Sequence, residues 1–337
     1  MNNPSLSTTE QEVIVDEVLA ASLQAQQKAG PDLRQIHTKS HGLLWGEFIV
    51  EPNLPEHLRV GLFKTPQTYP TWIRFSSGGS PESRGKLRSD RQPDVRGIGI
   101  KVMNVDGEKA LDDEEKTQDF TLNSHPTFLT KDIRDYADLP KVATGGLTPE
   151  RLKEMAYTAN ILQKIAEKKV GNPLLIQYWS MSPFRFGEKI VKLSVKSQQP
   201  EQPPENLPES ENYLRETIVK YLTEDKQEAY FDFLIQFYVD DEKTPIENLA
   251  QEWEETDSPF IKVATIRIPS QTFNFEERKR LDEGMLFTPW HTILEHEPVG
   301  SVNLSRKKLY SELAKARRAE IAQRLREPQP YEVLGAE

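Results

Sequence analysis

Hydrophobic and polar residues change their spacing along this chain, from the period of a helix to the two-residue period of strands. Residues 7–28 predict an amphipathic helix, which opens with Ser7 and Glu10 at the spacing of a capping box. From residue 42 the apolar residues instead form short, β-rich runs that partly alternate with polar ones. In the first half these runs predict strands over 44–50, 71–76, 97–102 and 117–122.

The second half repeats this pattern with longer runs, which predict strands over 184–197, 230–239 and 261–268. Polar stretches rich in Gly, Ser, Pro or Gln predict loops over 77–93 and 198–209. Helices are expected from Thr148, over 210–222 and around 306–317. More than six strands with helices inserted and appended favour an α+β fold, a closed antiparallel barrel carrying helices.

Composition narrows the function classes. The chain has 337 residues, of which 36% are hydrophobic and none is cysteine, so disulfides, thiolate ligands and cysteine nucleophiles are excluded. A net charge of -10 argues against general nucleic-acid binding. No run approaches the ~18 apolar residues of a membrane span, and no charged-then-apolar leader opens the chain. We therefore expect no membrane span and a cytoplasmic location.

The expected C-terminal helix carries an unusual set of side chains. Arg306, Tyr310, Leu313 and Arg317 are spaced i, i+4, i+7 and i+11, so they share one face. Guanidinium groups near a phenol favour the ionised phenolate, a hard anionic ligand suited to ferric iron. Tyrosinate is the proximal haem ligand of catalases. The helix therefore raises the possibility of a haem enzyme.

Five separated blocks of the sequence resemble, in order, the catalase superfamily. They are Arg34-x-x-His37-x-Lys39-x-x-Gly42, Thr71–Ser76, Asp94–Gly97, Asn123–Phe128, and Arg306-x-x-x-Tyr310 followed by Arg317. Together the blocks span residues 30–320, although residues 135–285 resemble the superfamily only in their general sequence pattern and not in any motif. Residues 287–291 and 298–303 resemble the short catalase-related group, which includes small peroxidases and fatty-acid hydroperoxide enzymes such as allene oxide synthases.

The resemblance implies a catalase-like antiparallel barrel with flanking helices, and a haem buried between the barrel and the C-terminal helix. We expect an N-terminal helical segment over 1–29, the haem-binding domain over 30–325 and a tail over 326–337. The resemblance, without the long arm that builds the tetramers of larger catalases, implies a homodimer.

The resemblance also implies a role for each candidate site residue. His37 would move a proton between the two peroxide oxygens, Ser76 would orient it, and Asn123 would hydrogen-bond on the same side. Tyr310 would be the metal ligand of a ferric haem b. The cofactor-binding arginines would be Arg34, Arg74 and Arg317 on the propionates and Arg306 beside Tyr310. Taken singly, each of these residues has an ordinary structural or surface interpretation.

The implied function is a haem-dependent hydroperoxidase, a catalase-related peroxidase acting through a ferryl haem intermediate. Its partners would be a small peroxide and an organic reductant. The alternatives are an enzyme that rearranges or cleaves fatty-acid hydroperoxides (allene oxide synthase or hydroperoxide lyase type), a weak catalase, and a barrel that binds haem or another ligand without turnover.

The sequence departs from catalases around the expected distal site. Ser124 replaces the second asparagine of the distal block, and Leu129 replaces a phenylalanine. Both changes are expected to weaken peroxide disproportionation without abolishing peroxide chemistry. Ile36, before the histidine, is apolar as in catalases, whereas the allene oxide synthase branch has a threonine at this position. This residue therefore favours the other functions over allene oxide synthesis.

Overall fold

The computed structural model describes residues 7–30, 33–34, 37–79, 81–83, 85–111 and 116–321 of the chain. The predictions on Ile36 and on the tail over 326–337 therefore lie outside the described residues.

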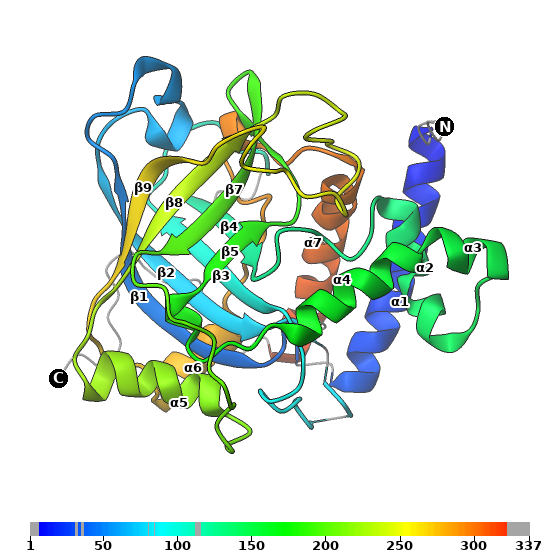
Figure 1. Ribbon diagram of the computed structural model, residues 1–337, viewed down its shortest axis with the longest axis horizontal. Coiled ribbons are helices and arrows are strands. Elements are labelled where there is room, and N and C mark those ends of the chain that lie inside the picture. Colours follow the sequence, from blue (N-terminus) through cyan, green and yellow to red (C-terminus); the bar gives the residue numbers. More distant parts are fainter. Residues whose placement is uncertain are drawn as a thin grey trace.

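A closed antiparallel β-barrel forms the body of the molecule (Figure 1). Eight strands hydrogen-bond in the order β5-β4-β3-β2-β1-β9-β8-β7, and β7 also pairs with β5, which closes the ring. The ninth strand, β6, pairs with β7 as a hairpin. The strands are β1 (Ser40–Val50), β2 (Thr68–Ser77), β3 (Arg96–Met103), β4 (Thr117–Asn123), β5 (Gln177–Ser180), β6 (Phe184–Phe186), β7 (Lys189–Ser197), β8 (Ala229–Phe237) and β9 (Ile261–Ile268). The predicted α+β barrel is confirmed.

Alternation along the strands separates the core of the barrel from its outer face. Phe48, Phe120 and Phe233 belong to one buried cluster, and the ring centroids of Phe120 and Phe233 lie 4.8 Å apart. Because successive side chains of a strand point to opposite faces, the neighbours Thr121 and Asn123 lie on the other face of the sheet. The same pattern that fills the barrel therefore leaves a second face for a site.

One strand prediction was wrong in detail. The run 184–197 forms two strands, because the backbone turns at Gly187 and brings Phe186 opposite Lys189. Gly187 has φ +64°, in the left-handed region that glycine adopts without a Cβ penalty. Strand β5 was not predicted, because four residues are too few to display a period.

Seven α-helices lie in the described part of the chain. They are α1 (Thr8–Ala29), α2 (Ile133–Thr144), α3 (Pro149–Glu154), α4 (Ala156–Glu167), α5 (Tyr213–Val219), α6 (Glu276–Gly284) and α7 (Ser301–Ile321). A π-turn (Lys220–Glu224) extends α5, and short 3-10 turns cover Glu56–Leu58, Gly61–Phe63, Pro173–Leu175 and Leu294–His296.

The helix starts predicted from the sequence are confirmed at two places. Ser7 and Glu10 form the reciprocal capping box of α1, and the Thr148 side chain accepts a hydrogen bond from the amide of Arg151 at the start of α3. The helix expected from Thr148 is divided between α3 and α4, which meet at Met155. Helices α2 and α6 were not predicted; α2 has a proline, Pro140, inside it. The C-terminal helix was expected, and α7 contains the whole stretch from Arg306 to Arg317.

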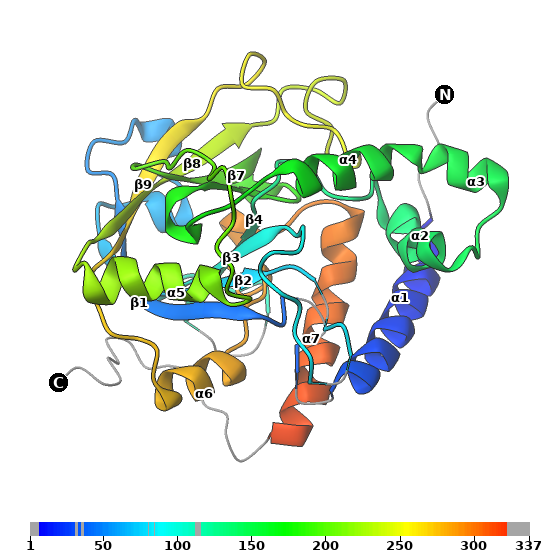
Figure 2. The same ribbon diagram turned by 60° about the horizontal axis from the view of Figure 1, so that its bottom comes forward.

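Helix α7 runs along the outside of the barrel, and α1 and α2 lie beyond it (Figure 2). The side-chain amide of Gln26 on α1 donates to the carbonyl of Leu313 on α7 at 3.3 Å, joining the first and last described helices. None of the helices in the described ranges is both long and apolar enough to cross a membrane.

Candidate active site

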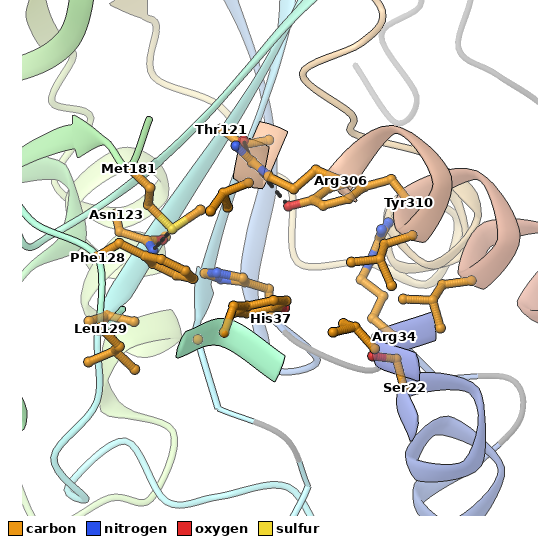
Figure 3. Close-up of a pocket in the computed structure, with 18 of the residues that line it drawn as sticks. Ser22, Arg34, His37, Thr121, Asn123, Phe128, Leu129, Met181, Arg306 and Tyr310 are labelled. Atoms are coloured by element: carbon orange, nitrogen blue, oxygen red, sulfur yellow. Dashed lines mark hydrogen bonds between the residues drawn. The ribbon is translucent and has the colours of Figure 1, made fainter. Parts of the chain in front are cut away.

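All eight candidate residues line one cavity of about 810 Å³. Figure 3 labels Arg34, His37, Asn123, Arg306 and Tyr310 among them. This volume is typical of a pocket for a cofactor or small ligand. The cavity lies between the outer face of β2–β4 and helix α7, and residues of α1 and α2 complete its wall. The eight are Arg34, His37, Arg74, Ser76, Asn123, Arg306, Tyr310 and Arg317.

His37 is held in an unusual backbone conformation. Its φ of +53° lies in the left-handed region, which non-glycine residues adopt at a cost and which is often found at functional sites. Its amide donates to the carbonyl of Gly78 at 3.1 Å, and its Nδ1 shares a hydrogen bond of 3.0 Å with the hydroxyl of Ser76. These contacts fix the imidazole and leave Nε2 as the nitrogen available for proton transfer.

The imidazole of His37 is neutral over the physiological range. Burial, and then the positive charges of three nearby arginines, lower the pKa of His37 to about 3. The arginines are Arg74, Arg34 and Arg306. A neutral imidazole can accept a proton and give it back, which is what the expected role requires.

The ring of His37 lies directly against strand β3. A Cβ atom added to Gly97 would lie 2.4 Å from Cε1 and 2.5 Å from Nδ1 of this ring. Glycine is therefore required at position 97 by the close approach of the imidazole, a constraint that the sequence alone did not reveal.

Asn123 ends strand β4 and is supported by its neighbour Ser124. The hydroxyl of Ser124 accepts from the amide of Arg96 at 2.9 Å, and its own amide donates to the Arg96 carbonyl at 2.7 Å. Lys168 donates to the Ser124 carbonyl at 2.6 Å. Ser124, which stands where catalases have an asparagine, thus anchors the segment Asn123–Phe128 through Arg96 and Lys168.

The wall beside Leu129 contains two aromatic rings. Phe128 and Tyr136 both line the cavity, with ring centroids 5.6 Å apart. Burial raises the pKa of Tyr136 to about 12, so its phenol is protonated at neutral pH. Tyr136 lies on a helix that was not predicted, and nothing in the sequence marked it as a cavity residue.

Tyr310 and Arg306 act as a pair on α7. One terminal guanidinium nitrogen of Arg306 donates to the phenol oxygen of Tyr310 at 3.2 Å and to the hydroxyl of Thr121 at 2.8 Å. The other donates to Ser182 and Asn303. Arg306 therefore ties the helix to the barrel while placing a positive charge beside the phenol.

Arg34, Arg74 and Arg317 lie around the same cavity, but the structure adds an acid that the sequence analysis missed. The Nε of Arg74 donates to Asp282 on α6 at 2.5 Å, and Arg34 donates to the Asp282 carbonyl at 2.9 Å. Burial by itself raises the pKa of the Asp282 carboxyl, but Arg74 and Arg34 outweigh it and hold the pKa below its usual range. Asp282 thus neutralises part of this positive charge.

The cavity is positively charged within an acidic chain. Six cationic side chains line its described part: Arg34, Arg74, Arg306, Arg317, Lys28 and Lys141. Glu17 supplies the single lining carboxylate among the described residues. Apolar and small side chains of the helices cover much of the remaining wall, among them Val18, Ala21, Ala25, Leu139 and Leu313. An apolar occupant that carries negative groups would suit this lining.

Replacing Gly97 by alanine tests how the imidazole is positioned. The new methyl group and the ring of His37 cannot both keep their places, so we expect the ring to move and the free energy of unfolding to fall by ~1–3 kcal/mol. A crystal structure of Gly97→Ala and denaturant unfolding would measure the two effects. Gly171→Ala is the control, since its Cβ would meet only the flexible carboxylate of Glu201 at 3.0 Å. An unmoved ring with unchanged stability would contradict the geometry.

Comparison with known proteins shows where this fold occurs. No family model and no curated protein matches the chain. Among solved structures, a fungal catalase superposes with a TM-score of 0.66 at 15% identity, covering 94% of this chain and 64% of the catalase. A bacterial catalase gives 0.66 at 18% identity, covering 99% and 67%.

Catalase A from Saccharomyces cerevisiae gives a TM-score of 0.66 at 17% identity, covering 94% of this chain and 66% of the catalase. The chain thus spans about two thirds of the length of the catalases it matches. Nearly all of this chain is covered by each superposition, and its barrel and helices have the catalase-like fold.

Proposed function

We propose that this chain is a haem-dependent hydroperoxidase, which reduces hydrogen peroxide or organic hydroperoxides and is restored by an organic reductant. The observation that carries the proposal is the convergence of a buried imidazole and an arginine-bound phenol on one cavity. His37 precedes the first strand, whereas Tyr310 lies on the last described helix. The fold shared with catalases supports the same interpretation.

The lining of the cavity fits a haem in its chemistry. Haem combines a flat apolar ring with two carboxylates, and the wall combines apolar side chains with an excess of cations. Tyr310 supplies a phenol oxygen, the donor that catalases use as proximal ligand. We assign Tyr310 as the iron ligand, Arg306 as the partner of its oxygen, and Arg34, Arg74 and Arg317 to the propionates.

When bound, the haem would supply the electrons that reduce the peroxide O–O bond. The residues of the chain manage the proton. With Nδ1 held by Ser76, Nε2 of the neutral His37 accepts the proton of the peroxide and returns it to the departing oxygen. The side-chain amide of Asn123 donates a hydrogen bond to the peroxide from the same side.

The absorption spectrum of the haem-loaded protein tests the ligand assignment. Tyr310→Phe removes the oxygen that the iron would bind, so we expect the tyrosinate-type charge-transfer bands to disappear. Haem affinity should fall by more than the ~10–100-fold typical of losing an outer-shell partner. Tyr136→Phe is the matched control, because it removes another phenol from the same cavity and should keep the bands. The reverse pattern in the two variants would refute the assignment.

Peroxide consumption tests the proton-transfer role. We expect His37→Gln to lower the rate by ~10²–10⁴-fold while the haem spectrum persists. His57→Gln, an exposed histidine, should leave both unchanged. Because the pKa of His37 is about 3, the imidazole stays neutral as the pH falls from 7 to 4. In the pH–rate profile, the loss of activity on the acid side that is due to His37 should therefore lie near pH 3. A loss of activity near pH 6.5 that disappears in His37→Gln would contradict this prediction.

A second candidate, the rearrangement or cleavage of a fatty-acid hydroperoxide, is favoured by the apolar wall. Val18, Ala21 and Leu313 give the cavity a surface that suits a hydrocarbon chain. Such an enzyme consumes no reductant. A polyunsaturated hydroperoxide converted to an isomer or to cleavage fragments, with no oxidation of an added dye, would favour this function. Alcohol formation with stoichiometric dye oxidation would favour the peroxidase.

A further inference from the structure

A methionine sulfur faces the residues proposed to activate the peroxide. Met181 lies in the loop between β5 and β6 and lines the cavity. The side-chain amide of Asn123 donates to its sulfur at 3.0 Å, and Figure 3 shows Met181 directed towards Asn123. A thioether is a weak hydrogen-bond acceptor, so this amide can leave the sulfur for a stronger acceptor.

The loop holds Met181 in place from both sides. The hydroxyl of Ser180 accepts from the amide of Leu193 at 2.9 Å. The hydroxyl of Ser182 donates to Asn303 at 2.8 Å and accepts from Arg306 at 3.1 Å. The residues on either side of Met181 are therefore anchored, and the amide of Asn123 contacts the sulfur itself.

Met181 differs from the other described methionines in its access to the cavity. Met103, Met155 and Met285 are buried, with at most 5% of their surface exposed, and they do not belong to the cavity lining. Met181 is partly exposed and does belong to it. Any oxidant that enters the cavity meets this sulfur before it meets the others.

We propose that Met181 is an oxidation site of this protein, converted to the sulfoxide by the hydroperoxide that the cavity admits. The inference rests on the proposed hydroperoxidase function for its oxidant. The sulfur lone pair attacks the terminal peroxide oxygen, an S–O bond forms and the O–O bond breaks. The proton passes to the departing oxygen, which leaves as an alcohol. Sulfur is oxidised by two electrons and the peroxide is reduced by two, so the reaction needs no further reactant.

The product would change the behaviour of Asn123. A sulfoxide oxygen is a far stronger acceptor than a thioether, so it holds the Asn123 amide that the peroxide would otherwise use. The peroxide then loses a hydrogen-bond donor, and turnover slows as sulfoxide accumulates. Because methionine sulfoxide can be reduced enzymatically, this loss of activity is reversible.

Mass spectrometry of the full chain tests the site directly. The haem-loaded protein is treated with a few equivalents of cumene hydroperoxide and digested. We expect one added oxygen on the Met181 peptide before any appears on the peptides of Met103, Met155 or Met285. Treatment with methionine sulfoxide reductases should remove the oxygen and restore the lost activity.

Two variants complete the test through the rate at which activity is lost during peroxide exposure. Leucine has about the volume of methionine and lacks the sulfur. With each protein normalised to its own initial rate, Met181→Leu should lose activity roughly tenfold more slowly, because its cavity wall has no oxidisable sulfur. Met155→Leu, at a buried position away from the cavity, should lose activity as fast as the unchanged protein.

The outcomes separate this inference from the proposed function. Peroxide turnover with an unmodified Met181, or equal inactivation of Met181→Leu and the unchanged protein, would overturn the oxidation site and leave the hydroperoxidase standing. Selective oxidation of Met181 in a protein that turns over no peroxide would support the site and overturn the hydroperoxidase.

Discussion

The site depends on the hydrogen bonds made by the buried guanidinium of Arg306. This side chain donates to Thr121 on β4, to Ser182 after β5, and to Asn303 and Tyr310 on its own helix, with 5% of its surface exposed. None of these four described partners carries a formal charge. A buried cation is costly without compensating partners, and these hydrogen bonds offset part of that cost. One side chain thus docks α7 against the barrel and positions the phenol of Tyr310.

Charge is distributed unevenly between the cavity and the rest of the molecule. The chain carries a net charge of -10, yet the charged residues in the described lining of the cavity are six arginines and lysines and a single glutamate. Asp282 neutralises part of this charge at Arg74 and Arg34, and the remainder suits an occupant with carboxylates. Burial, and then the charges of Arg74, Arg34 and Arg306, lower the pKa of His37, so the arginines that we propose to hold the cofactor also help to keep the imidazole neutral.

The departures from catalases change the surroundings of Asn123 more than Asn123 itself. Ser124 makes a reciprocal pair of hydrogen bonds with the backbone of Arg96, and the amide of Asn123 is directed at a sulfur. Leu129 leaves the aromatic part of this wall to Phe128 and Tyr136. The amide of Asn123 therefore has a weak acceptor, which a stronger one could replace.

The sequence by itself predicted the barrel strands, the capped first helix and the shared helix face of Arg306, Tyr310 and Arg317, because alternation, capping and helical spacing are local properties. The roles of the eight candidate residues were implied by the resemblance to the catalase superfamily and stay predictions. The sequence could not reveal β5, which is too short to show a period, or the turn at Gly187, which depends on one backbone torsion angle. It also missed Tyr136, Met181 and Asp282, since packing alone brings them to the site. Gly97 belongs to the block Asp94–Gly97 that the sequence singled out, but only the folded structure shows that the ring of His37 packs against it. Contacts between residues far apart in sequence leave no local pattern, so the tertiary structure decided them.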